Sequence, residues 1–489
     1  MLVKGNKRVE VSAPGFYADR DISVPNANEV ICVLASAKIL SQEALNGEAK
    51  VSYRVSYKVI YNGENGIDCH EENWEEYVSV KSAGITAGSR LDLYANVVSA
   101  EHVGVKNLKA RATVEIKGYA VLDYHFEPLD APEGILAKTL TVAVENIESI
   151  KESEIIASLD FEYREVIDRI LTHDTKIIIN SVASATEMCE VRGECITYVT
   201  YLSNGGLCSK TLITPFDAEI LTPGIFAGQK AHCFGRASAS TLTLSSDGNS
   251  SAIKTEIVVG IRGFAVSTHD AEILNDAYSC QKELEIKYQE AFVEDNICVA
   301  GATEKLFSTL RIPVDKPKIR AIQALLTPSI VAINAFNAGG GLTAEGIVGV
   351  PVVYLDENEK LQTEKVEIPF HFIATRDFRC GRNISANATI VSIACRVKHN
   401  DELEFSGEIS VNVHASGERG VKYIEQIREI GEREQSDAAI SLYIVKAGET
   451  LWDVAKALMS DEENLLKLNP DVKLPLIGGE KVLLFREIE

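Results

Sequence analysis

Ile116-Lys117-Gly118-Tyr119-Ala120-Val121 is the stretch from which the fold of this chain can be worked out, because it returns as Ile261-Arg262-Gly263-Phe264-Ala265-Val266. A weaker third copy follows at Phe405-Ser406-Gly407-Glu408-Ile409-Ser410-Val411. The three central glycines are about 145 residues apart, and a fixed period of this kind indicates a repeated structural unit. We therefore expect three copies of one unit, at residues 1–130, 138–275 and 282–416.

Within each copy, an alternating run rich in Val, Ile, Thr and Tyr leads to a turn. The runs are residues 55–61, 196–201 and 348–354, and the turns are Asn62-Gly63, Ser203-Asn204-Gly205 and Asp356-Glu357-Asn358. Period-two alternation predicts strands, and Asn-Gly between two such runs predicts a β-hairpin. Only the short stretches 29–34, 165–171 and 319–326 have a helical pattern. The predicted fold class is mainly β, with three tandem antiparallel β-sandwich or barrel-like repeats.

The composition narrows the classes of partner and compartment. The chain has 489 residues and a formal net charge of -22, which argues against nucleic acid and anionic lipid as partners. Neither a secretion signal nor an apolar run of about 18 residues is present, so we expect a cytoplasmic protein without a transmembrane segment. The ten cysteines form no CxxC pair and are expected to be reduced thiols rather than zinc ligands.

A charged segment, residues 417–440, follows the third repeat. Its apolar residues recur every three positions, at Val421, Ile424, Ile427 and Ile430. This spacing predicts a short helix with one apolar edge inside a linker.

The last part of the chain, residues 441–489, has a β-α-α-β pattern. Tyr443-Ile444-Val445 is a short predicted strand, and Lys446-Ala447-Gly448-Glu449-Thr450-Leu451-Trp452 leads into a helix that Thr450 caps, with Asp453 in its first turn. Ser460 is the predicted cap of a second helix, which Asn469-Pro470 ends. Gly478-Gly479 then turns into a last strand at residues 481–485.

This C-terminal pattern, with Gly-Glu-Thr-Leu-Trp and Leu-Asn-Pro at these spacings, resembles the LysM domain over its whole length. The resemblance implies a shallow groove for N-acetylglucosamine-containing glycans, or for a protein partner, between the loop after the first strand and the loop after the second helix. Carried over by position, the candidate binding residues are Gly448, Glu449, Thr450, Leu451, Asn469, Pro470, Asp471, Ile477 and Gly478. Glu449 stands where the family usually has Asp, and Glu480 where it usually has Gln. Trp452 is expected in the core.

A catalytic constellation is not apparent in the sequence. Gly339-Gly340-Gly341 lacks the Gly-Lys-Ser/Thr of a phosphate loop, and the motifs HExxH and GxSxG are missing. The histidines His125, His269 and His414 follow the repeated strand at nearly the same offset, and we interpret them as strand-end residues that bond a neighbouring loop. We expect no enzyme activity, no cofactor and no metal site.

The repeats resemble the SPOCS domains of spore coat morphogenetic proteins. The resemblance is carried by Ile312-Pro313, Lys316-Pro317-Lys318-Ile319, the hairpin at Tyr354 and Ile368-Pro369-Phe370, with an echo at Ile22-Ser23-Val24-Pro25. Together with the LysM-like end, the chain is similar to the SipL-like family, to which SpoVID is related. That family implies a non-enzymatic mother-cell adaptor at the forespore surface, with a SpoIVA-like basement-layer ATPase as partner. The alternative is a protein that binds cortex or cell-wall peptidoglycan directly.

Overall fold

The structure, a computed structural model, describes residues 3–126, 129–311, 317–339, 341–376, 383–399, 402–433 and 439–485. Within these ranges the chain is mainly β with two short helices, which confirms the predicted class. Ile312-Pro313 and Lys316, which carry part of the family resemblance, lie outside the described residues, as do residues 434–438 and 486–489.

The first third of the chain forms two three-stranded antiparallel sheets, here called the first sheet pair. The strands are β1 (Val3–Ser23), β2 (Ala27–Leu45), β3 (Glu48–Gly63), β4 (Gly66–Lys81), β5 (Arg90–Val103) and β6 (Asn107–Phe126), in the orders β1-β6-β5 and β2-β3-β4. Alternate residues of β3, from Val51 to Val59, are buried in one core with Val11 of β1 and Val114 of β6. The period-two pattern therefore places the apolar side chains between the two sheets.

The second sheet pair has the same strand pairing. Its strands are β7 (Leu136–Tyr163), β8 (Arg169–Ala185), β9 (Met188–Ser203), β10 (Gly206–Leu221), β11 (Lys230–Ser246) and β12 (Ser251–Tyr278), in the orders β11-β12-β7 and β10-β9-β8. Asn204 and Gly205 connect β9 to β10 with positive φ angles of 50° and 71°. Asn and Gly tolerate this left-handed conformation, which a two-residue hairpin requires, so the predicted hairpin is confirmed.

The third sheet pair follows. Its strands are β13 (Lys282–Arg311), β14 (Ile319–Leu325), β15 (Ser329–Ala338), β16 (Gly341–Asp356), β17 (Leu361–Thr375), β18 (Asn383–His399) and β19 (Glu402–Glu432). One sheet has the order β13-β19-β18, and in the other β16 pairs with β14, β15 and β17.

The three short stretches predicted as helical, residues 29–34, 165–171 and 319–326, are not helices. Their described strand residues belong to the starts of β2, β8 and β14. One apolar cluster joins side chains from all three stretches with parts of β3, β9, β10 and β16: Ile31, Cys32, Leu34, Leu171, Ala324 and Leu326 are among its members. A strand that is buried on both faces does not alternate between apolar and polar residues, and the register of each strand also skips one residue here. The apolar spacing in these stretches therefore resembles that of a helix.

The predicted helix and linker at residues 417–440 are also wrong over most of that range. Strand β19 continues to Glu432 and pairs with β13 along its whole length. The register shifts between Lys287 and Tyr288 and again between Glu283 and Leu284. Each β-bulge adds one residue to β19, which produces the three-residue spacing of Ile424, Ile427 and Ile430 in an extended strand. Val421 and Ile424 lie in continuous register and are buried in different apolar clusters.

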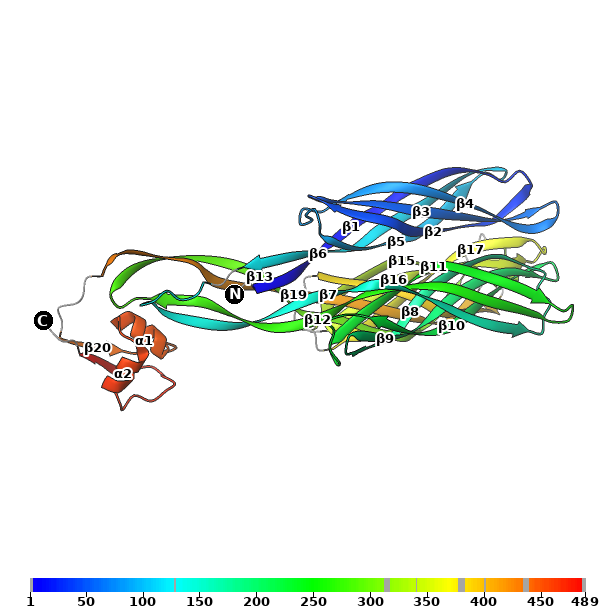
Figure 1. Ribbon diagram of the computed structural model, residues 1–489. Helices are drawn as coiled ribbons and strands as arrows, with labels where there is room; N and C mark the ends of the chain where they lie inside the picture. Colours follow the sequence, from blue (N-terminus) through cyan, green and yellow to red (C-terminus); the bar gives the residue numbers. More distant parts are fainter. Residues whose placement is uncertain are drawn as a thin grey trace.

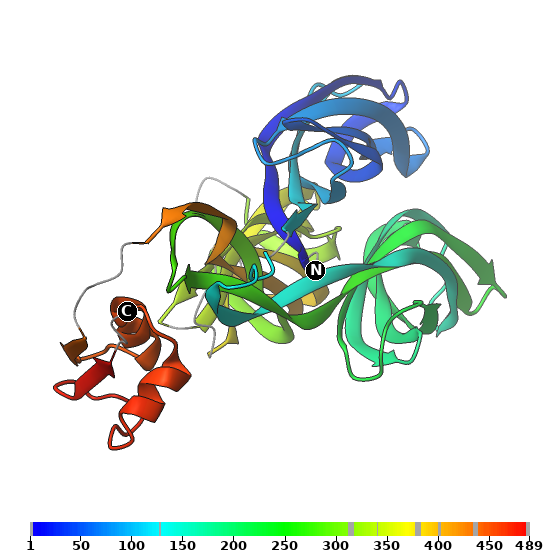
Figure 2. The same cartoon turned by 60° about the vertical axis from the view of Figure 1, so that its left-hand side comes forward.

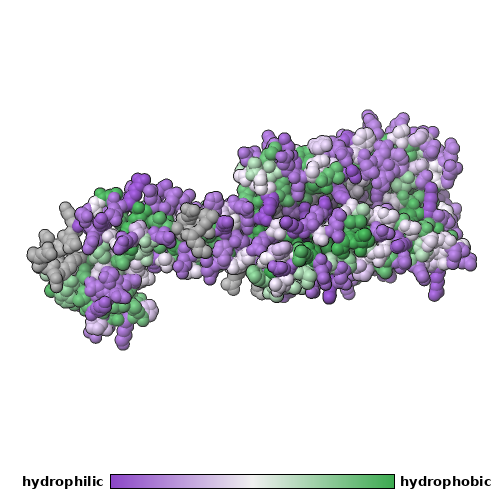
Figure 3. All heavy atoms as spheres, in the orientation of Figure 1, coloured by the Kyte–Doolittle hydropathy of each residue, from purple (hydrophilic) through white to green (hydrophobic). Residues whose placement is uncertain are grey.

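The long strands extend beyond the sheet pairs as two-stranded ribbons. The β7/β12 ribbon (residues 136–147 with 266–278) and the β13/β19 ribbon (residues 282–295 with 417–432) run toward the C-terminal module (Figure 1). The ribbons pack together through Val142, Ile273, Val293, Val421 and Val3 of β1. Figure 2 shows the three sheet pairs as separate bodies beside these ribbons. In Figure 3 the visible surface is largely hydrophilic, with hydrophobic patches between the sheet pairs and on the ribbons.

The first strands of the three sheet pairs are joined by a ring of side-chain to main-chain hydrogen bonds. In each bond a side-chain oxygen accepts from a backbone N–H of another first strand: Asn6 from Ile147 at 2.6 Å, Glu145 from Ile297 at 2.9 Å, and Glu294 from Arg8 at 3.1 Å. The bonds run from β1 to β7, from β7 to β13 and from β13 back to β1, so the three sheet pairs close on one another.

The C-terminal module consists of β20 (Ile440–Ile444), α1 (Leu451–Leu458), α2 (Glu462–Leu468) and β21 (Lys481–Phe485), with β20 antiparallel to β21. Thr450 caps α1 in a reciprocal capping box with Asp453, and Trp452 is buried, as predicted. The predicted second cap is off by one residue. Asp461, not Ser460, accepts the N–H of Asn464, because the backbone N–H of Ser460 still bonds Ala455 at the end of α1.

Candidate functional site

The two loops named by the sequence lie side by side in the C-terminal module. Main-chain hydrogen bonds join them, from Val445 N to Glu480 O at 2.9 Å and from Gly479 N to Val445 O at 2.7 Å. Gly478 has a φ of 102°, and a Cβ atom there would lie 2.9 Å from Ala447. Glycine is therefore required at this crossing, where the loops form one continuous surface.

On the first loop, Gly448 and Thr450 are exposed, while Glu449 and Leu451 are half-buried. The Glu449 carboxylate accepts the Lys446 N–H at 2.8 Å and the Tyr443 hydroxyl at 2.9 Å. These bonds, the Lys446 amide first, lower the pKa of Glu449 and keep it ionised at neutral pH. Its carboxylate thus holds the loop in shape.

On the second loop, Pro470, Asp471 and Ile477 are exposed and Gly478 is half-buried. Asn469 differs from them because it is buried. Its amide donates to the carbonyls of Leu465 and Leu483, at 2.8 and 2.7 Å, and accepts the Leu483 N–H at 2.8 Å. This candidate residue ties α2 to β21 and lies beneath the surface that the other candidates form.

Two further residues of this surface were not among the sequence candidates. The Glu480 carboxylate accepts the N–H groups of Ile477 and Gly478, both at 2.8 Å, and these bonds lower its pKa. Leu474 is 53% exposed, close in sequence to Ile477, which is 82% exposed. Glu480 stands where the pattern that the sequence resembles usually has Gln, and this difference could have drawn attention to it. Nothing in that pattern pointed to Leu474. The surface combines exposed apolar side chains with two ionised carboxylates, which suits binding rather than proton transfer.

Helix α1, which follows the first loop, is bound to the tip of the β7/β12 ribbon. Asp276 accepts from Trp452 Nε1 at 2.9 Å and pairs with Lys456 Nζ at 2.6 Å. Tyr278 donates its hydroxyl to the Ser460 carbonyl at 2.7 Å, and its ring lies 4.9 Å from that of Trp452. Sequence reasoning did not find this contact, because Asp276 and Tyr278 end a strand of a different part of the chain. It fixes where the module sits.

The three in-register histidines have different environments. His125 is exposed on β6, and the ring of His269 lies within hydrogen-bonding distance of Asn146. His414 is 5% exposed, with its ring 5.0 Å from that of Phe234. His269 and His414 lie well inside paired strands, so the strand-end interpretation is wrong for them, whereas His125 is next to the last residue of β6. In the ranges that the structure describes, no three His, Cys, Asp or Glu side chains come together as a metal site.

Among the described residues, no helix has the length and apolar character that crossing a membrane would need. A scan against protein-family models gives no match to this chain, and a search of the curated proteins gives none either.

Proposed function

We propose that this chain is a non-enzymatic scaffold in endospore coat assembly, built from three SPOCS-like β-sandwich repeats and a LysM-like module. Its place would be the mother-cell cytoplasm at the forespore surface, and its partner a SpoIVA-like coat ATPase. The proposal rests on the resemblance of the sequence to that family.

The observation that supports it most is how the C-terminal module is presented. Asp276 and Tyr278 bind the module to the end of the β7/β12 ribbon, and this end lies far from the three sheet pairs (Figure 1). The two loops, with Leu474 and Ile477 exposed, are on the same small module. A rigidly held module with an exposed apolar pair suits the docking of a protein, because little freedom is lost on binding.

The test is a pull-down with the purified ATPase, comparing the full chain with a chain that ends at Ala439. Binding only by the full chain is the expected result. In the full chain, Ile477→Asp is expected to weaken binding about tenfold, since it removes apolar contact and adds a charge. Leu221→Asp is the matched control, because Leu221 is also an exposed aliphatic residue (75%) but lies on β10. Equal binding by the truncated chain would sink the proposal.

The alternative is direct binding of N-acetylglucosamine-containing glycan by the same loops. The adjacency of the two loops favours it, since apolar and polar groups together suit a sugar face. Co-sedimentation with purified sacculi tests it with the same chains. Pelleting of the full chain and of Leu221→Asp, but not of the truncated chain, would favour glycan over protein. Zymography against purified wall is expected to show no clearing.

A further inference from the structure

A large cavity lies where the three sheet pairs face one another. Its volume is about 1300 Å³, and its walls come from β2, β3, β4 and β5 of the first sheet pair, β7, β8, β11 and β12 of the second, and β13, β18 and β19 of the third. Much of the lining is hydroxyl or amide, including Thr175, Ser238, Asn387, Thr389 and Asn412. The walls are thus polar, in contrast to the apolar cluster that joins the same sheet pairs elsewhere.

The charge of the lining is opposite to that of the chain. Five basic residues line the cavity, Lys38, Arg54, Lys176, Arg236 and Arg262, against three acidic residues, Glu71, Glu152 and Asp174. The whole chain has a net charge of -22. The lining thus differs in charge from the chain as a whole, and an anion would be attracted by those basic groups that lack a carboxylate partner.

Most of these charges are neutralised within the wall. Arg236 pairs with Glu152 at 2.5 Å, Arg262 with Asp92 at 2.5 Å, and Lys176 with Asp174 at 3.1 Å. These pairs hold the basic side chains in place at the boundary between the sheet pairs.

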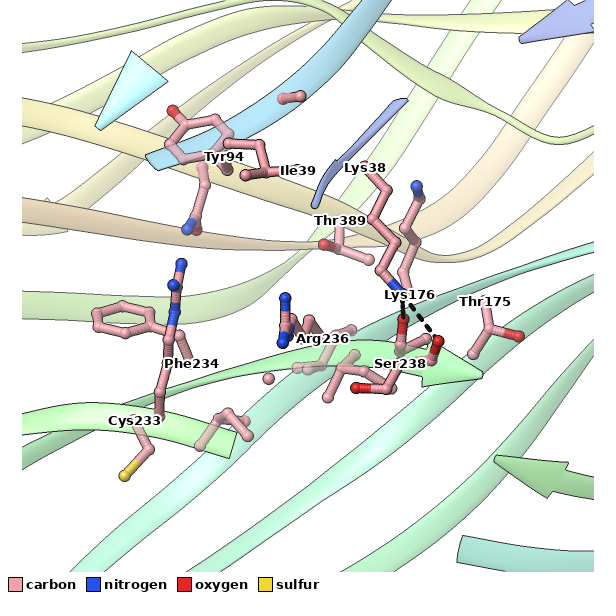
Figure 4. A pocket seen from close by; sticks show the side chains of 18 of the residues that line it. Lys38, Ile39, Tyr94, Thr175, Lys176, Cys233, Phe234, Arg236, Ser238 and Thr389 are labelled. Carbon is pink, nitrogen blue, oxygen red and sulfur yellow. Dashed lines mark hydrogen bonds between the residues drawn. The ribbon is translucent and has the colours of Figure 1, made fainter. Parts of the chain in front are cut away.

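Lys38 is the exception. It reaches from β2 across to β11, and its ammonium donates to the carbonyls of Ser238 at 2.8 Å and Ala237 at 3.5 Å (Figure 4). Within the described ranges Lys38 forms no ion pair with a carboxylate. Burial lowers the pKa of Lys38, the nearby charges of Arg236 and Arg54 lower it further, and those of Glu154 and Glu152 partly oppose them. Arg236 and Arg54 keep the carboxylate partners Glu152 and Glu75, so Lys38 is the cation of this wall whose charge an anion in the cavity would balance.

We propose that this cavity binds a polyvalent oxyanion, a small molecule that carries phosphate or carboxylate groups, with Lys38 and Arg236 as its principal contacts. An ammonium and a guanidinium donate charge-assisted hydrogen bonds to either group. The surrounding hydroxyls and amides contact the polar remainder of the ligand. Because the walls belong to all three sheet pairs, the bound anion also bridges them. This site is separate from the loops of the C-terminal module and does not depend on their function.

Calorimetric titration of the full chain tests the site with inorganic phosphate, tripolyphosphate and citrate as probes. We expect binding of one anion per chain, weakened about tenfold or more in Lys38→Ala and in Arg236→Ala. Lys50→Ala is the matched control, because Lys50 is an exposed lysine on β3 and is not one of the residues that line the cavity. Binding of the phosphates alone identifies a phosphate-bearing ligand, and binding of citrate alone a carboxylate-bearing one.

The proposal is overturned if none of the three probes binds up to about 10 mM, a weak limit for a specific site. It is also overturned if Lys50→Ala weakens binding as much as Lys38→Ala, because the attraction would then be diffuse. Acylation of lysines in the unaltered chain, mapped by mass spectrometry, gives an independent measurement that needs no variant. Tripolyphosphate or citrate is expected to protect Lys38 and not Lys50, and equal protection of both would again contradict the site.

Discussion

The guanidinium of Arg8 and the carboxylate of Glu294 lie 2.8 Å apart, although 286 residues separate them in the sequence. Both side chains are almost completely buried, with 4% and 3% exposed. The rings of Tyr119 and Phe264 lie within 5.4 and 5.8 Å of the guanidinium, so strands from two sheet pairs cover it. The Arg8 guanidinium thus pairs its charge with Glu294 and places its planar faces near aromatic rings.

Removal of one partner of this ion pair should be costly. Arg8→Ala leaves the Glu294 carboxylate buried without its counter-charge, and a loss of about 3 to 5 kcal/mol in the free energy of unfolding is expected. Denaturant titration followed by circular dichroism measures it. Lys7→Ala is the control, because Lys7 also forms an ion pair with the third sheet pair, through Glu418 of β19, but its side chain is 43% exposed. Its expected cost is under about 1 kcal/mol, and equal costs for the two variants would refute the importance of burial.

The histidines beside Arg8 should make the protein sensitive to acid. Burial, and then the charge of Arg8, lowers the pKa of His414 to about 3 and that of His232 to about 4. In the unfolded chain a histidine takes up its proton near pH 6.5. The contribution of these two neutral histidines to the free energy of unfolding is therefore fully present above about pH 6.5. It is lost as the pH drops toward 4, by about 1.4 kcal/mol per pH unit for each histidine.

The double variant His232→Gln, His414→Gln should flatten this dependence between pH 6.5 and 4. Thermal unfolding across that range measures the effect, and His70→Gln is the control because His70 is on β4, 38% exposed beside Glu72. An unchanged slope in the double variant would assign the acid sensitivity to other groups.

The C-terminal module should become mobile when its anchor is removed. Asp276→Asn deletes the ion pair with Lys456 and weakens the bond from Trp452, at an expected cost of about 1 to 3 kcal/mol for the docked state. Faster hydrogen exchange at the ribbon tip and α1, with unchanged exchange in the sheet pairs, is the expected readout. Asp270→Asn, an exposed position on the same strand, should leave exchange unaltered.

Asn469 should affect binding only through folding. Asn469→Ala removes two hydrogen bonds to the main chain of Leu483 in β21 and one to the Leu465 carbonyl in α2. We expect the module to lose about 2 to 3 kcal/mol of stability, together with its partner binding. Asn464→Ala, which removes only a bond to Ser460 at 3.2 Å, is the control. If Asn469→Ala lost binding but kept full stability, this residue would be a direct contact.

The sequence predicted best where local chemistry determines the structure. Asn204-Gly205 needs only its own backbone preferences to form a hairpin, and Thr450 needs only Asp453 to start α1. Prediction failed where distant strands alter the local pattern. The stretch around Ile31 is buried on both faces by other sheet pairs, and the spacing of Ile424 and Ile427 comes from a bulge opposite β13.

The candidate site could be predicted in part for the same reason. The loop residues Gly448 and Ile477 were found by their position in a short module. Asp276 and Lys38 were not, because each acts across a contact with a strand far away in the chain. Neither residue belongs to a motif, and only the three-dimensional arrangement gives it a partner.

The closed ring of β1, β7 and β13 has a consequence for synthesis on the ribosome. On the ribosome, Arg8 is made 286 residues before Glu294. At translation rates of about 5 to 20 residues per second, Glu294 is synthesised roughly 15 to 60 seconds after Arg8. During that interval the first sheet pair can fold, but the surface that later contacts the second and third sheet pairs is exposed to water and to chaperones. The nascent chain is therefore most vulnerable to mispairing with another copy before its own third sheet pair has emerged.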